Sequence, residues 1–250
     1  MANVNANGYT VVFAAVSCII CSVLLSGANV SLKDMQDKNK TVDKQRNVLM
    51  AAQLADATTP PDTISSWFAK DENGNSDIKA IIIDNESGTE DKEIDLKAFE
   101  KKPANFPGKS LIYECTKEGQ EVIILPIDGV GLWGKMLGFL AVKPNGNDVV
   151  GISFYYHIET PGLGAEITEP WFTSQYPGKK LLTTPGDFSD ESYRGIEVKK
   201  GIKVVDLPEA DQPYSVDGIS GATITSNGVT DITKKYVKEK YISYLKNRNK

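Results

Sequence analysis

The sequence predicts an α+β fold: an antiparallel or mixed sheet with flanking helices, tethered by one N-terminal transmembrane helix. Three observations support this prediction: an apolar N-terminus without charged residues, short runs of β-branched and aromatic residues through the middle of the chain, and a helical apolar repeat at its C-terminus. The 250 residues leave room for one large or two small domains, which usually contain about 100–200 residues. We expect an anchor over residues 1–32, a juxtamembrane helix or linker over 33–60, and one folded domain over 61–250.

Composition excludes several classes of protein. The chain contains 28 Lys and Arg against 33 Asp and Glu, which gives a net charge of −5. A mildly acidic chain lacks the basic surface of a nucleic-acid-binding protein, so we expect no nucleic-acid partner. With 21 Gly, 12 Pro and 3 Cys, collagen-like, low-complexity and disulfide-rich classes are also excluded.

The N-terminal segment is apolar and carries no Asp, Glu, Lys or Arg before Lys33. Residues 9–30 supply roughly the 20 residues that a helix needs to cross a bilayer. The alternative is a cleaved signal peptide, for which the small residues 26–28 form an acceptable cleavage site. Its basic N-terminal region is missing, because no Lys or Arg precedes the apolar run. We therefore favour a retained single span.

The charges beside this segment bear on its orientation. Five basic residues follow the span and none precedes it: Lys33, Lys38, Lys40, Lys44 and Arg46. The positive-inside rule, applied alone, places the folded domain in the cytoplasm.

Two cysteines lie within the predicted span. Cys18 and Cys21 are three residues apart, so they share one face of the helix. They are either half of a metal or iron–sulfur site completed by a partner, or small apolar residues in an apolar helix. We favour the second interpretation and predict no metal site in this chain. Cys115 is the only cysteine beyond the anchor, so no disulfide can form within the folded domain.

Secondary-structure signals follow in order along the rest of the chain. A charged helix is expected over residues 31–56, with its end near Pro60, and loops at 65–68 and 71–77. Short β-branched or aromatic runs predict strands at residues 80–83, 111–113, 122–125, 138–142, 149–156 and 202–205. Asn145-Gly146 favours a hairpin between the fourth and fifth of these strands. A helix is expected over 164–176, and helical spacing of apolar residues predicts a last helix over 224–246.

The segment Gly129-Val-Gly131-Leu-Trp-Gly134 matches the G-x-G-x-x-G pattern of dinucleotide-binding proteins. In those proteins the pattern opens a helix, and an acidic residue follows about 20 positions later. Here residues 136–142 are typical of a strand, and no second parallel strand ends in Asp or Glu at that distance. We therefore reject NAD binding and interpret the match as chance or a tight structural turn.

A second small-residue cluster, Asp217-Gly-Ile-Ser-Gly-Ala-Thr-Ile-Thr-Ser226, lies just before the last predicted helix. Its small residues let a bulky anion approach the backbone, and its hydroxyls can donate hydrogen bonds. The start of the helix adds free N–H groups and the positive end of the helix dipole, which favour phosphate. The alternative is an ordinary N-cap preceded by glycine.

Three segments together carry a resemblance. Asp217-x-x-Ser220-Gly221-Ala222-Thr223 resembles the flavinylation motif D-x-x-[ST]-G-A-[TS] of FMN-binding domains. The segment 157–164 resembles their E-T-P-G-L-G loop, and residues 129–133 resemble their G-x-G-L-W segment. In the chain these motifs follow one N-terminal span in the order 129–133, 157–164 and 217–223. As an ordered set they resemble the C subunits of Na⁺-translocating NADH:quinone oxidoreductases. The resemblance extends over most of the chain beyond about Pro126.

The resemblance implies a cofactor and the residues that hold it. A flavin transferase would join the FMN phosphate to the hydroxyl of Thr223, and Trp133 and Leu163 would flank the isoalloxazine ring. Asp217 would serve recognition by the transferase or cap the turn. The only histidine, His157, is expected to be structural. The implied cofactor-binding residues are Trp133, Glu159, Thr160, Gly162, Leu163, Gly164, Asp217, Ser220, Gly221, Ala222 and Thr223.

The function implied is electron transfer by an FMN-carrying subunit of a membrane complex. That complex would couple NADH oxidation and quinone reduction to Na⁺ export, with the NADH, quinone and Na⁺ sites on other subunits. The nearest alternative is the flavin-carrying G subunit of an Rnf-type ferredoxin:NAD⁺ oxidoreductase, and a further one is a tethered, non-redox ligand-binding or scaffold domain. The resemblance places the flavin domain on the periplasmic side of the inner membrane, against the Lys/Arg count, and we favour that side.

Overall fold

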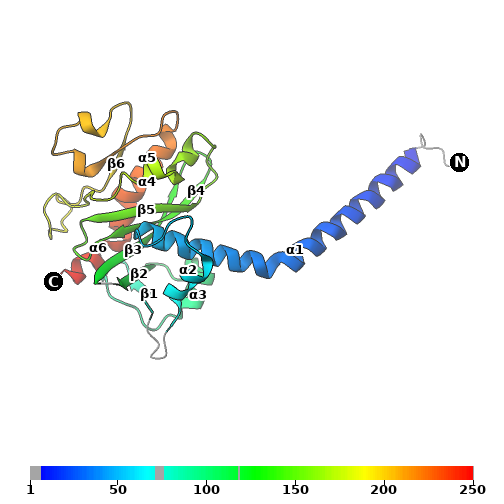
Figure 1. Cartoon of the computed structure of the whole chain (residues 1–250), viewed down its shortest axis with the longest axis horizontal. Helices are drawn as coiled ribbons and strands as arrows, with labels where there is room; N and C mark the ends of the chain where they lie inside the picture. Colours follow the sequence, from blue (N-terminus) through cyan, green and yellow to red (C-terminus); the bar gives the residue numbers. More distant parts are fainter. Residues whose placement is uncertain (1–6, 71–75, 118, 250) are drawn as a thin grey trace. The chain divides into compact units, whose positions relative to one another are not determined.

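The computed structural model describes residues 7–70, 76–117 and 119–249. It divides into two compact units, Met1–Asp43 and Lys44–Lys250, which are described separately. Helix α1 (Asn7–Ala51) runs through the first unit and into the second (Figure 1). Most of the loop expected at 71–77 lies outside the described residues.

The first unit is the N-terminal part of α1. Its apolar side chains are exposed, including Phe13 at 62% and Leu25 at 72%. Cys18 and Cys21 are exposed as well. Within the described part of the chain, the helix Gly8–Ala51 is the one segment long and apolar enough to cross a membrane. The predicted N-terminal apolar helix is therefore present.

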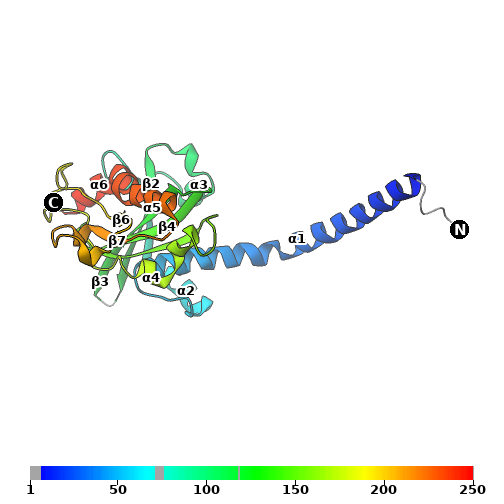
Figure 2. The same ribbon diagram turned by 90° about the horizontal axis from the view of Figure 1, so that it is seen from above.

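The second unit is built on a five-stranded antiparallel sheet in which each strand pairs with the next one in sequence (Figures 1 and 2). Its strands are β1 (Ile78–Asp84), β2 (Lys109–Lys117), β3 (Gln120–Val130), β4 (Lys135–Val142) and β5 (Val149–Tyr156). The predicted α+β class and its five strands before residue 157 are confirmed. A separate, two-stranded parallel sheet pairs β6 (Glu197–Lys199) with β7 (Ser215–Asp217).

The hairpin between β4 and β5 forms where Asn145-Gly146 predicted it. Gly146 has φ +66°, a left-handed conformation that glycine adopts without steric cost. The Asn145 side chain accepts hydrogen bonds from the backbone N–H groups of Asn147 and Asp148, both at 3.0 Å.

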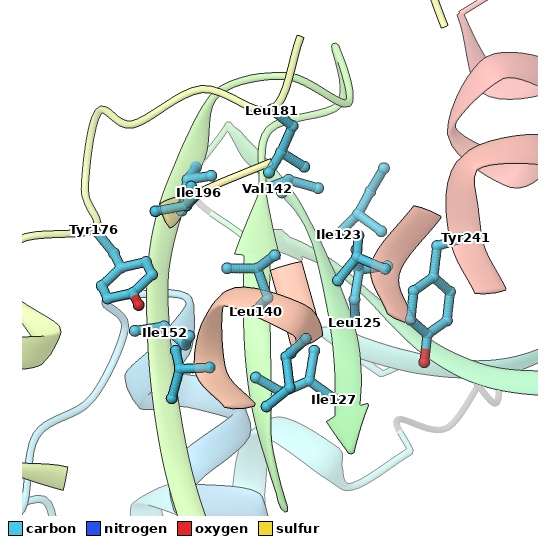
Figure 3. Close-up of a cluster of buried hydrophobic side chains, with 14 of the residues drawn as sticks. Ile123, Leu125, Ile127, Leu140, Val142, Ile152, Tyr176, Leu181, Ile196 and Tyr241 are labelled. Atoms are coloured by element: carbon cyan, nitrogen blue, oxygen red, sulfur yellow. The ribbon is translucent and has the colours of Figure 1, made fainter. Parts of the chain in front are cut away.

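One face of the sheet is covered by the C-terminal helical segment. This segment runs without a break through α5 (Thr223–Asp231), the π-helical turn Ile232–Tyr236 and α6 (Val237–Arg248), which confirms the helix predicted at 224–246. Alternation along β3 directs every second side chain to this face. The β3 side chains on this face are Ile123, Leu125 and Ile127. Figure 3 shows the resulting core, in which they lie beside Leu140 and the C-terminal segment contributes Tyr241.

The other face is covered by the end of α1, together with α2 (Pro61–Phe68) (Figure 2), whereas α3 (Leu96–Lys101) contacts β1. The Ser153 hydroxyl donates to the backbone carbonyl of Asn47 at 2.7 Å. Gly151 leaves room for α1, because a Cβ there would lie 2.6 Å from the Ala51 carbonyl oxygen.

Helix α1 ends at Ala51, five residues before the predicted end at 56. Gln53 has φ +58°, and its N–H donates to the Met50 carbonyl at 3.0 Å. The Leu54 N–H donates to the Leu49 carbonyl at 2.9 Å. This pair of bonds is a Schellman motif, which closes the last turn of a helix without glycine here.

Three further local predictions were wrong. The loop expected at 65–68 is the end of α2, which begins at Pro61 because proline suits the first position of a helix. The helix expected over 164–176 is interrupted before Pro170, because the proline ring disfavours helical backbone at the preceding residue. In its place, a 3₁₀ turn (Gly164–Thr168) precedes the short helix α4 (Pro170–Thr173). The strand expected at 202–205 is replaced by a 3₁₀ turn at Val204–Asp206.

Candidate functional site

The G-x-G-x-x-G match lies in the hairpin that joins β3 to β4. The Gly131 N–H donates to the Gly134 carbonyl at 2.8 Å, which closes a tight turn between antiparallel strands. Gly129 is needed for packing, since a Cβ there would lie 2.4 Å from the Cγ1 atom of Ile232. The segment opens no helix, which agrees with rejecting the dinucleotide-binding interpretation.

Glu159 lies at the centre of the site and is 5% exposed. Its carboxylate accepts hydrogen bonds from the backbone N–H of Trp133 at 2.9 Å and of Leu132 at 3.1 Å. It also accepts a hydrogen bond from the hydroxyl of Thr225, 66 residues further along the chain. One side chain therefore joins the β3–β4 turn, the loop after β5 and the first turn of α5.

These hydrogen bonds decide the ionisation of Glu159. Burial by itself would raise the pKa of the carboxyl group. The hydrogen bonds from Thr225, Trp133 and Leu132 outweigh burial and lower the pKa below its usual 4.5. Glu159 is consequently ionised at neutral pH, and a charged acceptor strengthens each of the bonds it receives.

Glycines allow the three segments to approach one another. A Cβ on Gly131 would lie 2.6 Å from a Glu159 carboxylate oxygen, and a Cβ on Gly164 would lie 2.5 Å from the Thr225 hydroxyl oxygen. Gly221, with φ +73°, lies beneath Leu163, whose Cδ2 atom would be 2.9 Å from a Cβ there. The three motifs predicted from the sequence therefore meet in one place.

Thr223 is the first residue of α5, and its side chain is exposed. The preceding residue, Ala222, makes no side-chain capping bond, and the first helical bond runs from the Ser226 N–H to the Ala222 carbonyl at 2.9 Å. The N–H groups of the first turn therefore point out of the helix beside Thr223, where the helix dipole favours an anion. The alternative of an ordinary side-chain N-cap does not describe this helix.

Exposed apolar side chains lie on the three segments that meet at this site. Trp133 is 62% exposed, and its indole N–H donates to the Thr160 hydroxyl at 3.0 Å. Leu163 is 41% exposed and follows Gly162, whose left-handed backbone forms the turn. Further exposed apolar side chains on the same segments are Val130, Leu132, Ile158 and Ile224. Such a group of exposed apolar residues indicates a binding surface.

Asp217 points to a different part of the chain. Its carboxylate accepts a hydrogen bond from the Val204 N–H at 2.7 Å and pairs with the Lys203 ammonium at 2.9 Å. Burial would raise its pKa, but these bonds lower it overall. Its own N–H donates to the Gln175 side chain at 2.7 Å. Asp217 thus holds the turn at residues 203–204.

His157 forms a local contact. Its Nδ1 atom accepts a hydrogen bond from the backbone N–H of Glu159 at 3.3 Å, which helps to shape the loop after β5. Within residues 7–70, 76–117 and 119–249, no group of three or more His, Cys, Asp or Glu side chains is arranged to hold a metal ion.

Sequence reasoning missed Thr225 as the partner of Glu159, and it missed the contact of Asp217 with residues 203–204. Both contacts join segments that only the tertiary fold brings together. For the first of them, the sequence held only one signal, a threonine two residues after the motif.

Comparison with known proteins defines the class. A sequence model of the FMN-binding domain family matches residues 131–238. This range begins within the β3–β4 turn, ends within α6, and contains residues 131–134 of that turn, the loop 157–164 and the cluster 217–226. The second unit therefore contains an FMN-binding domain, carried on a chain with a long apolar N-terminal helix.

Relatives of known identity match nearly the whole chain. The C subunit of the Na⁺-translocating NADH-quinone reductase from Yersinia pestis is 34% identical over 243 residues, covering 89% of this chain and 85% of the relative. The C subunit from Pseudomonas aeruginosa is 32% identical and covers 100% of this chain and 99% of the relative. The crystal structure of the C subunit from Parabacteroides distasonis superposes with a TM-score of 0.68 at 25% identity, covering 86% of this chain and 96% of that one. The chain belongs to the family of C subunits of Na⁺-translocating NADH-quinone reductases, as its motifs predicted.

Proposed function

We propose that this chain is an electron-transfer subunit that carries FMN as a phosphoester on Thr223. The observation that supports this most strongly is the convergence of three distant segments around the exposed Thr223 at the uncapped start of α5. Membership of the family of reductase C subunits and of the FMN-binding domain family agrees with this assignment.

The residues present suit FMN. The first turn of α5 offers N–H groups and a positive dipole end to a phosphate, and Gly221 lets the chain pass close to it. Four hydroxyl residues occupy the cluster 217–226, but Thr225 and Ser226 are buried, at 2% and 0% exposure. Thr223 and Ser220 are exposed, and of these two Thr223 lies on the helix itself.

An attachment through the phosphate fixes the cofactor without a bond to its ring. Bound FMN would supply one-electron chemistry at that ring. The exposed side chains of Trp133 and Leu163 can contact the apolar faces of an aromatic ring. The hydrogen bond from the Trp133 indole N–H to the Thr160 hydroxyl orients the indole. Glu159 holds the backbone of Leu132 and Trp133, so we assign it to positioning the turn rather than to contact with the cofactor.

The chain is one part of a larger redox pathway. Its relatives are named as subunits of a Na⁺-translocating NADH-quinone reductase, so we infer that it passes electrons between other subunits of such a complex. NADH oxidation, ubiquinone reduction and Na⁺ export would take place on those subunits. An ion path needs several spans with polar groups inside the membrane, which the single apolar segment of α1 cannot provide.

We infer that the flavin domain lies in the periplasm, where a flavin transferase would act on it. Protease treatment of spheroplasts tests this: cleavage within residues 44–249 is expected without lysis. A domain that resists protease until the membrane is opened would place it in the cytoplasm, as the Lys/Arg count suggests.

The alternatives make different predictions. The relatives described above are C subunits of the quinone reductase, which favours that complex over an Rnf-type oxidoreductase and its G subunit. A non-redox scaffold domain would carry no flavin.

A denaturing gel viewed under ultraviolet light distinguishes a flavin-carrying subunit from a scaffold domain. The wild-type band from cells with the transferase should fluoresce, and the Thr223→Ala band should be dark. A dark wild-type band would contradict the redox function, and Thr168→Ala, which changes an exposed threonine outside the three segments, is the control, expected to fluoresce.

A further inference from the structure

A cavity of about 540 Å³ lies where the central sheet divides. Strands β2 and β3 pair only between Tyr113–Ile124 and Lys117–Gln120. Beyond that point, the first residues of β2 pair with β1 alone and the last residues of β3 pair with β4 alone. The cavity is lined by both strands where they separate, by residues 99–108 and by the C-terminal helical segment. Its volume is within the range of small-molecule sites, about 300–1,000 Å³.

The cavity has an aromatic lining. Three pairs of neighbouring rings contribute both of their members to it: Phe99 with Phe106, Phe139 with Tyr155, and Tyr236 with Tyr241. Their ring centroids are 5.6, 5.2 and 6.3 Å apart. Pairs that already contact each other form preorganised walls, and aromatic rings favour offset-stacked or edge-to-face contact with another ring.

Charged groups also line the cavity. Lys44 bonds Glu100 at 3.1 Å, and Lys135 bonds Asp128 at 3.0 Å. Each of these pairs is partly exposed, so it can exchange partners with a polar group of a ligand at modest cost.

Two further lysines, Lys109 and Lys240, line the cavity and determine the sign of its net charge. Lys109 turns toward Asp84 and Asp91, at 3.2 and 2.7 Å, and these carboxylates do not line the cavity. Lys240 is half-buried in the lining. Lys44, Lys135 and Lys109 are each paired with a carboxylate. Lys240 therefore adds one positive charge to the lining beyond these ion pairs, which favours an anionic group in the ligand.

We propose that this cavity binds a planar aromatic molecule with an anionic substituent, such as an aromatic carboxylate. The aromatic part would stack against the exposed ring of Tyr155, which rests on the buried ring of Phe139, and the anion would meet Lys240. None of the lining residues belongs to the three flavin-site segments, so the site is separate from the proposed attachment at Thr223 and does not depend on it.

The test compares 2-naphthoate with 2-naphthylmethylammonium, which has a similar shape and the opposite charge. Both are measured by equilibrium dialysis against the full chain in lipid nanodiscs, with empty nanodiscs as background. We expect saturable binding of about one naphthoate per chain and at least tenfold weaker binding of the ammonium compound. Absence of saturable naphthoate binding, or equal affinity for both compounds, would overturn the proposal.

Two neighbouring tyrosines provide a matched pair of variants. Tyr155 lines the cavity, whereas Tyr156 does not, and successive side chains of a strand point to opposite faces. Both are surface-accessible, at 39% and 48% exposure, so either change to Leu should leave the fold intact, which circular dichroism checks. Tyr155→Leu should weaken naphthoate binding at least fivefold and Tyr156→Leu should not. Lys240→Gln should reduce the preference for the anion. Equal effects of the two tyrosine changes would place the binding elsewhere.

Discussion

The backbone N–H of Trp133 donates to the buried carboxylate of Glu159 at 2.9 Å. This bond joins the tip of the β3–β4 hairpin to the loop after β5, and the Thr225 hydroxyl joins the same carboxylate from α5. The exposed indole of Trp133 therefore takes its position from a residue that does not itself face solvent. The proposed flavin site is organised by this buried carboxylate before any cofactor is attached.

Replacing Glu159 by Gln should disrupt this arrangement. The amide removes the charge and turns an N–H₂ group toward donors, so one or more buried N–H groups lose their acceptor. We expect the free energy of unfolding to fall by about 1–3 kcal/mol, with less covalent flavin per chain. Thermal unfolding and absorbance of the purified protein measure both.

Glu166→Gln is the matched control, because Glu166 belongs to the same loop and accepts a bond from the Trp171 indole at 2.7 Å. It should have the smaller effect on both quantities. An equal loss of stability and flavin content in the two variants would contradict the proposed role of Glu159 in organising the site.

The lowered pKa of Glu159 predicts a pH dependence. A carboxyl group whose pKa is lower in the folded than in the unfolded state stabilises the fold above its unfolded pKa. This stabilisation is lost as the pH falls below the ordinary value of 4.5 and through the folded pKa. Denaturant unfolding of wild type and Glu159→Gln should therefore give a stability difference that narrows below about pH 4.5. A difference that stays constant into acid would show that ionisation of Glu159 contributes nothing.

Gly164→Ala should be more damaging than Gly162→Ala. A methyl group on Gly164 would lie 2.5 Å from the Thr225 hydroxyl oxygen and 2.6 Å from a Glu159 carboxylate oxygen, so the central contact must open. Gly162 has open space around it and φ +72°, so alanine there costs only backbone strain, about 1–2 kcal/mol. Flavin content and melting temperature of both variants test this order, and the reverse order would contradict the packing described.

Asp217 offers a test of what the first residue of the flavinylation motif does. Asn at this position keeps an oxygen that can accept the Val204 N–H, whereas Ala does not. If Asp217 acts by holding the 203–204 turn, Asp217→Asn should keep most of the covalent flavin and Asp217→Ala should lose most of it. Flavin content after expression with the transferase decides the matter, and equal loss in both variants would mean that the transferase recognises the charge itself.

The sequence was informative where one interaction dominates. Runs such as Val122–Leu125 predicted strands because β-branched side chains suit a buried pleat, and the C-terminal apolar repeat predicted its helix. Prediction failed where a single residue overrode a pattern: Pro170 interrupts the helix expected over 164–176, and Gln53 ends α1 early through its left-handed backbone.

The site was predictable as a set of motifs but not as a geometry. The sequence indicated the three segments and Thr223, whereas the role of Glu159 depends on a partner 66 residues away. Likewise, Asp217 lies in the motif but bonds the turn at 203–204. Contacts of this kind depend on tertiary packing, which local patterns do not encode.

The most direct test of covalent flavin attachment is peptide mass spectrometry of the full chain, purified from cells that contain the flavin transferase. We expect the peptide containing Thr223 to be heavier by one FMN less one water, and fragmentation to place the added mass on Thr223. An unmodified Thr223 peptide, or FMN attached to Ser220 instead, would contradict the proposed site.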